Sequence, residues 1–187
     1  MSTITPLIPR QPAADLRVDL IGGGVFDLAT ATPENFTLIV VYRGYHCPIC
    51  KGYLGKLKRI LPDLTERGVD VLVVSTDPKD RAEKADAEWQ LSELQHGYGM
   101  SLETAHDWGL YISTSRGKTS MGVVEPALFA EPGLFLVRAD GTLFFCSVQS
   151  MPFLRPDLAA LTGAIDFVLK NDYPARGEVT ELPIAAE

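Results

Sequence analysis

Two kinds of hydrophobic pattern alternate along the chain, and together they predict an α/β domain. Continuous apolar runs at 38–42 and 69–75 predict buried strands. After Cys50 the apolar residues recur instead at the spacing of a helix that ends at Gly68, on the stripe Tyr53, Leu54, Leu57, Ile60, Leu61 and Leu64. A buried strand is therefore followed directly by an amphipathic helix, and then by a second buried strand.

Glycine-containing turns predict two β-hairpins. Residues 17–21 and 25–28 flank three consecutive glycines, which supply the positive φ angles of a tight turn. These glycines could also cradle a phosphate, but the Lys-Ser/Thr pair and the following helix of a P-loop are missing. A second hairpin is predicted from 133–137 and 143–148, which bracket Asp140-Gly141.

Three further helices are predicted from the residues at their ends. One runs from Pro78 to about Gln95 with Asp77 as its cap, a shorter one spans 101–109, and Pro156 opens the last. The polar residues 114–121 show no periodicity. They form either an ordinary solvated loop or a loop that guards a site.

Length and composition indicate one globular domain. An extended, proline-rich segment (1–14) precedes the domain (15–172), and a tail (173–187) follows it. The formal net charge of -7 argues against nucleic acids and anionic membranes as partners. The chain shows neither a signal-peptide pattern nor an apolar run of membrane-spanning length. Three cysteines do not make a disulfide framework, so we expect a cytoplasmic protein.

The motif Cys47-Pro48-Ile49-Cys50 lies where the first buried strand leads into the helix. A helix N-terminus favours thiolate, and Cys-x-x-Cys pairs have lowered pKa values. With the cations Arg43 and Lys51 nearby, the pKa of Cys47 is expected below its usual range. We interpret the pair as redox-active and expect a Cys47–Cys50 disulfide without a Cys146 bridge. Half of a zinc site or two inert core cysteines are the alternatives.

The order of elements and several short runs resemble a known family. The runs VVSTD (73–77), FLVRADG (135–141) and Tyr42-Arg43-Gly44 before the cysteines are similar to the peroxiredoxin-like (alkyl hydroperoxide reductase/thiol-specific antioxidant) branch of the thioredoxin superfamily, in its Cys-x-x-Cys form. The resemblance covers about 17–170. It implies a thioredoxin fold, with a central mixed sheet flanked by helices and an N-terminal β-hairpin extension.

The chain departs from that family at accessory positions. In the peroxiredoxin pattern Pro-x-x-x-Thr/Ser-x-x-Cys, the attacking cysteine corresponds to Cys50, the hydroxyl to Cys47 and the proline to Arg43. The family's arginine before the GLF run is replaced by Pro132. A proline there is similar to the thioredoxin cis-proline, so we expect a cis Glu131–Pro132 bond facing the dithiol, with Pro126 as the rival position. Lys51 agrees with the thioredoxin pattern.

Four other residues have alternative interpretations. His46 either tunes Cys47 or is a plain loop residue. His96 and His106, near ends of predicted helices, are expected to be structural. Cys146 alternates within a predicted strand and is expected to be a small core residue.

Three functions remain open from the sequence. In a dithiol oxidoreductase, an exposed Cys47 attacks protein disulfides and the more buried Cys50 resolves the product. In a thiol peroxidase, Cys50 becomes a sulfenic acid and Cys47 closes the disulfide. The alternative is a binding or scaffold module without turnover. Either enzyme needs no cofactor or metal and takes electrons from a thioredoxin- or glutathione-type thiol; a homodimer is compatible with both.

Overall fold

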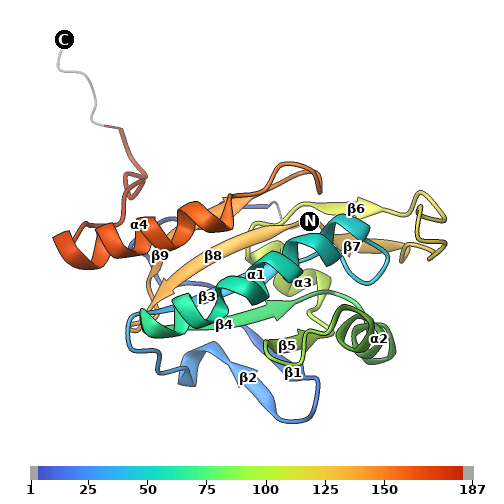
Figure 1. Cartoon of the computed structure of the whole chain (residues 1–187). Helices are drawn as coiled ribbons and strands as arrows, with labels where there is room; N and C mark the ends of the chain where they lie inside the picture. The colour runs from blue at the N-terminus through green and yellow to red at the C-terminus, as the bar shows by residue number, and fades with distance from the viewer. Residues whose placement is uncertain (1–3, 183–187) are drawn as a thin grey trace.

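Seven strands form one mixed sheet in a computed structural model that describes residues 4–182 (Figure 1). The sheet order is β2-β1-β5-β4-β3-β8-β9. Its strands are β1 (Arg17–Leu20), β2 (Val25–Asp27), β3 (Phe36–Val41), β4 (Val69–Val74), β5 (Gln95–Tyr98), β8 (Gly133–Arg138) and β9 (Leu143–Val148). A small second sheet pairs β6 (Ile112–Thr114) with β7 (Leu128–Ala130). The helices are α1 (Pro48–Glu66), α2 (Lys79–Trp89), α3 (Leu102–Asp107) and α4 (Leu158–Asn171), with a 3-10 turn η1 (Leu28–Thr30).

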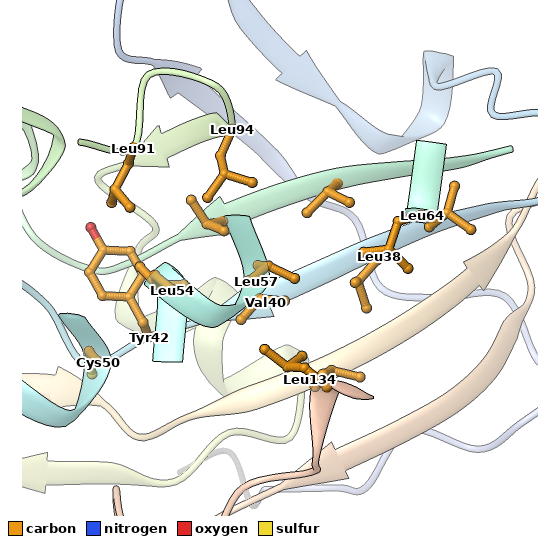
Figure 2. Packing of buried hydrophobic residues seen from close by; sticks show 14 of the residues in the cluster. Leu38, Val40, Tyr42, Cys50, Leu54, Leu57, Leu64, Leu91, Leu94 and Leu134 are labelled. Atoms are coloured by element: carbon orange, nitrogen blue, oxygen red, sulfur yellow. The ribbon is translucent and has the colours of Figure 1, made fainter. Parts of the chain in front are cut away.

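Strand β3 lies at the centre of the sheet and is buried along its whole length. It pairs in parallel with β4 and antiparallel with β8. Leu38 and Val40 belong to the cluster under α1, α2 and α4 (Figure 2), whereas Ile39 and Val41 pack on the opposite face with α3. The mixed sheet with helices on both faces confirms the predicted thioredoxin-like fold, and burial from both sides explains why the sequence of β3 is a continuous apolar run.

Both predicted hairpins and the long helix are confirmed. Strands β1 and β2 pair antiparallel around the three glycines, and β8 and β9 pair around Gly141, whose φ is 80°. Helix α1 continues through Pro62 to Glu66. Proline is tolerated inside it at the cost of a backbone hydrogen bond.

The helix predicted for 78–95 was wrong in its second half. Helix α2 ends at Trp89, because Gln90 takes the left-handed conformation (φ 56°) that closes helices. Residues 95–98 form β5, which pairs in parallel with β4. Its sequence, QHGY, has no apolar run, so only the neighbouring strand makes it a strand.

The segment before β1 contacts both the start of β9 and the segment after α4. Leu143 donates its backbone N–H to the carbonyl of Gln11 (2.9 Å), and Arg10 donates through Nε to the carbonyl of Ala175 (2.8 Å). Arg10 also pairs with Glu178 at 3.1 Å. Within residues 4–182, none of the helices has the length and hydropathy needed to cross a bilayer.

Candidate active site

Helix α1 presents both cysteines at its N-terminus. Cys47 is the N-cap residue, and its Sγ accepts the backbone N–H of Cys50 at 3.3 Å. Pro48 follows as the first helical residue, as predicted. Cys50 lies inside the apolar cluster beside Tyr42 and Leu54 (Figure 2). The sulfurs thus share one helix end but have different neighbours.

The pKa values of the two thiols are shifted in opposite directions. Hydrogen bonds from the side chain and the backbone of Cys50, with the cations Arg155 and Arg43, outweigh burial and lower the pKa of Cys47 to about 6. Burial, and then the hydrogen bond and negative charge of Cys47, raise the pKa of Cys50 well above its usual value. The predicted acidity of Cys47 is confirmed in direction. Lys51 is solvent-exposed and is not among the cations that lower it.

Arg155 is the site residue that the sequence did not reveal. Its Nη2 donates to the Sγ of Cys50 at 3.0 Å across 105 residues of sequence. The guanidinium lies 5.0 Å from the ring centroid of Tyr53, and its Nε donates to the carbonyl of Pro152. No spacing rule links a loop arginine to a distant cysteine. The only hint was Pro132, which stands where the family has an arginine.

Arg43 links the connector before Cys47 to the small β6–β7 sheet. Its Nη2 lies 3.3 Å from Glu125 Oε1, and its Nε lies 3.2 Å from Glu131 Oε2. The guanidinium also stacks over Phe129, 4.6 Å from the ring centroid. Ser113 donates to the other oxygen of Glu131 at 2.6 Å. Both carboxylates are buried, so this cluster fixes the position of one wall of the site.

The connector between β3 and Cys47 depends on Gly44 and Asp77. Gly44 has a φ of 127°, and a Cβ there would lie 2.6 Å from Asp77 Oδ2. That same oxygen accepts the backbone N–H of Tyr45 at 2.6 Å, while Oδ1 accepts Nε of Arg81 at 2.9 Å. Asp77 was expected to cap α2, but the N-cap is Pro78. Burial raises the pKa of Asp77, and its bonds hold the turn before the cysteines.

His46, the last residue of the same connector, is buried and is uncharged at neutral pH. Its Nδ1 lies 3.4 Å from Nη2 of Arg81, and its ring meets Phe129 edge-on at 4.7 Å. Burial, followed by the charge of Arg43, lowers the pKa of His46 to about 4. The imidazole therefore adds no positive charge beside Cys47 near pH 7.

The predicted cis bond at Pro132 was wrong. No peptide bond between residues 4 and 182 is cis, which also removes Pro126 as the rival position. Glu131 donates its N–H to the carbonyl of Tyr111 (2.7 Å), and the carbonyl of Pro132 accepts the N–H of Gln149 (2.9 Å). These bonds carry an extended, trans backbone from β7 into β8. Pro132 is buried and does not line the cavity that reaches Cys47.

A cavity of about 580 Å³ leads to Cys47 but is not lined by Cys50. Residues 116–120 form part of its wall, so the polar loop of uncertain role belongs to the site. Phe153, which is 71% exposed, borders this cavity and a second one of about 420 Å³ beside Arg155. The expectation of an exposed Cys47 was wrong, because Cys47 is only 1% exposed and Cys50 0%.

The remaining candidates lie outside this cavity. Cys146 is half-buried and packs against the core cluster on the opposite face of the sheet, and burial raises its pKa. His96 bonds the Tyr42 hydroxyl (2.7 Å) and Asp86 (3.0 Å), which supports a structural role. All three cysteines are unpaired. In the part of the chain that the structure describes, no three or more His, Cys, Asp or Glu side chains gather as a metal site would require.

Comparisons with known proteins agree on one family. The AhpC/TSA family matches residues 9–145. An AhpC from Enterococcus faecalis shares 18% identity over 90% of this chain and 98% of its own, with a TM-score of 0.68. The peroxidoxin BcpB from Mycobacterium tuberculosis shares 14% over 88% and 97% (TM-score 0.65), and a reduced 2-Cys peroxiredoxin from Plasmodium vivax shares 14% over 89% and 84% (0.68). Curated proteins yield no match by sequence.

Proposed function

Because the chain belongs to the AhpC/TSA family and is a thiol-dependent oxidoreductase, we propose that it is a peroxidase in which Cys47 attacks the peroxide. The observation that carries this assignment is the state of Cys47: its pKa is lowered to about 6, and it lines the 580 Å³ cavity. Its 1% exposure favours a small peroxide over the disulfide of a folded protein.

The chemistry takes two steps on this helix end. The Cys47 thiolate attacks one peroxide oxygen, the O–O bond breaks, and the alkoxide or hydroxide leaves with a proton from solvent. This leaves a sulfenic acid on Cys47. Cys50 then attacks that sulfur, which forms the Cys47–Cys50 disulfide and releases water. Arg155, at 3.0 Å from Cys50 Sγ, stabilises the attacking Cys50 as a thiolate.

The same contact favours a second assignment, in which Cys50 attacks the peroxide and Cys47 resolves. The family pattern aligns Cys50 with the attacking cysteine, and an arginine beside a sulfur favours the thiolate. Against it stand the raised pKa of Cys50 and its absence from the cavity lining. The reductant is a thiol in either case, and three cysteines in 187 residues are too few for a disulfide framework, which supports a reducing cytosol as the compartment.

Two single-cysteine variants test the assignment. Cys50→Ser and Cys47→Ser are exposed briefly to hydrogen peroxide, trapped with dimedone and analysed by mass spectrometry. We expect sulfenic acid on Cys47 in Cys50→Ser and no sulfenic acid on Cys50 in Cys47→Ser. The reverse result would support the second assignment, and trapping at neither sulfur would refute the peroxidase.

In the wild type, peptide mapping after peroxide should find the Cys47–Cys50 disulfide, with Cys146 free. Arg155→Met should slow disulfide closure roughly tenfold or more, because a charge-assisted hydrogen bond contributes about 1.5–3 kcal/mol. Arg59→Met, on the exposed face of α1, is the matched control.

A further inference from the structure

The cavity at Cys47 is lined by more positive charge than peroxide reduction needs. Its polar lining includes Arg43, Arg116, Lys118, Thr119 and Ser120, with Glu125 as the acidic member. This concentration of cations runs against the formal net charge of -7 of the whole chain. Peroxides such as hydrogen peroxide are neutral, so the cations call for another ligand.

The one carboxylate in the cavity lining, Glu125, already has hydrogen-bonding partners on both of its oxygens. One oxygen of Glu125 lies 3.3 Å from Nη2 of Arg43, and the other accepts the backbone N–H of Arg116 at 2.7 Å. The side chains of Arg116 and Lys118 are exposed and make no ion pair within residues 4–182. The cations Arg116 and Lys118 of the cavity lining are thus available to bind an anionic ligand.

The shape of the cavity limits the size of the ligand that can reach Cys47. Cys47 is 1% exposed, and the walls of the cavity that reaches it include the 116–120 loop together with Pro152 and Phe153. A folded protein would have to insert its thiol past these walls, whereas a flexible small molecule can enter. A volume of about 580 Å³ is that of a small-molecule pocket.

We propose that the cavity binds a low-molecular-weight anionic thiol, of the glutathione class, as the reductant of the Cys47–Cys50 disulfide. This inference rests on the proposed function for the origin of that disulfide. Arg116 and Lys118 bind the carboxylates of the thiol, and Thr119 and Ser120, which line the same cavity, supply hydroxyl groups for its amides. The cations also attract the thiolate during its approach.

The exchange proceeds in two balanced steps. The small thiolate attacks Cys47 Sγ, the Cys47–Cys50 bond breaks, and Cys50 leaves as a thiolate beside Arg155. With Cys47 held in the mixed disulfide, its negative charge no longer raises the pKa of Cys50. A second thiolate attacks the small molecule's sulfur and releases the Cys47 thiolate with a symmetric small disulfide. Two thiols are oxidised, and one protein disulfide is reduced.

The test uses full-length protein oxidised with diamide, so that it does not depend on a peroxide step. The rate constants of reduction by glutathione, neutral 2-mercaptoethanol and cationic cysteamine are compared at equal thiolate concentration and at low and high salt. We expect glutathione to be at least tenfold faster than the other two at low salt, with the advantage shrinking at high salt. Arg116→Gln/Lys118→Gln should lose roughly tenfold with glutathione only. Lys84→Gln/Lys170→Gln removes the same charge from exposed helix positions and should behave as the wild type.

Three results would overturn the proposal: equal rates for the three thiols, equal effects of the two double variants, or faster reduction by a thioredoxin at matched thiolate concentration. The peroxidase assignment is scored separately, by sulfenic acid trapping in the dithiothreitol-reduced protein. A negative result for the reductant therefore does not affect the test of the peroxidase assignment, and a negative result for the peroxidase does not affect the test of the reductant.

Discussion

The surroundings of Cys47 and Cys50 differ sharply, although the two sulfurs lie three positions apart on one helix turn. Both cysteines belong to the apolar cluster under α1, but Cys47 also borders the cavity with its charged lining, whereas Cys50 does not. Their exposed fractions, 1% and 0%, do not separate them. Their pKa values shift in opposite directions, because hydrogen bonds and nearby charges favour the thiolate at one sulfur and burial opposes it at the other. Solvent exposure alone is therefore a poor guide to which cysteine reacts.

The two surroundings are also held together differently. Ion pairs from Arg43 to two glutamates hold the wall beside Cys47. Around Cys50 the structure is held mainly by the packing of α1 on the sheet, and Arg155 adds a long-range polar contact. Loss of one charge should accordingly be most costly on the Cys47 side.

The largest effect is expected for Arg43→Met. The substitution leaves Glu125 and Glu131 buried without their cation, which should lower the free energy of unfolding by about 3–5 kcal/mol. Urea denaturation of the reduced protein measures this loss. Arg17→Met removes an exposed pair with Asp27 (3.6 Å) and should change stability by less than about 1 kcal/mol. Equal losses in both variants would show that the buried cluster does not hold the wall.

A pH-dependent effect should come next in size. The pKa of Cys47 is lowered from 9.0 to about 6, so the unfolded chain binds more protons than the folded one between these values. The resulting stabilisation is fully present above pH 9 and is lost as the pH falls through 6. At pH 8 the reduced wild type should exceed Cys47→Ser by about 2–3 kcal/mol more than it does at pH 5.

Cys146→Ser provides the control for this titration. Burial raises the pKa of Cys146, so that thiol stays neutral in the folded and unfolded states below pH 8. Its stability curve should run parallel to that of the wild type between pH 5 and 8. If Cys47→Ser also runs parallel, Cys47 is not a stabilised thiolate.

The elements that depend on residues close in sequence were predicted correctly from the pattern of apolar and turn residues. The run that became β3, the apolar stripe of α1 and the turn at Gly141 all depend on neighbours close in sequence, and each was predicted from the sequence. The cysteine pair at a helix N-terminus follows from the same local order. Strand β5 was missed because its pairing with β4, rather than its own composition, makes it extended.

The rest of the site depends on contacts between distant segments. Arg155 reaches Cys50 across 105 residues, and Asp77 accepts the backbone N–H of Tyr45 instead of capping the backbone of α2. The sequence Glu131-Pro132 is compatible with a cis or a trans peptide bond. In the structure the bond is trans, and the two residues form backbone hydrogen bonds with Tyr111 and Gln149. The sequence thus indicated the two candidate cysteines and the cation Arg43, but not Arg155, which donates to Cys50.

The smallest expected effect concerns Gly52, two residues after Cys50 and inside α1. A Cβ at this exposed position meets no atom within 4 Å, and glycine inside a helix costs about 0.5–1 kcal/mol relative to alanine. Gly52→Ala should therefore raise the free energy of unfolding by that amount, as should Gly163→Ala in α4, where the Cβ is equally unobstructed.

The rate at which iodoacetamide alkylates Cys47 in Gly52→Ala should stay within about twofold of the wild type. The α1 residue whose hydrogen bonds lower the pKa of Cys47 is Cys50, and this substitution leaves it in place. On the Cys47 side Gly44 allows no such exchange, because its φ is 127° and Asp77 fills the space of a Cβ. A loss of stability in Gly52→Ala, or a changed alkylation rate, would show that the helix behind Cys50 is as constrained as the connector before Cys47.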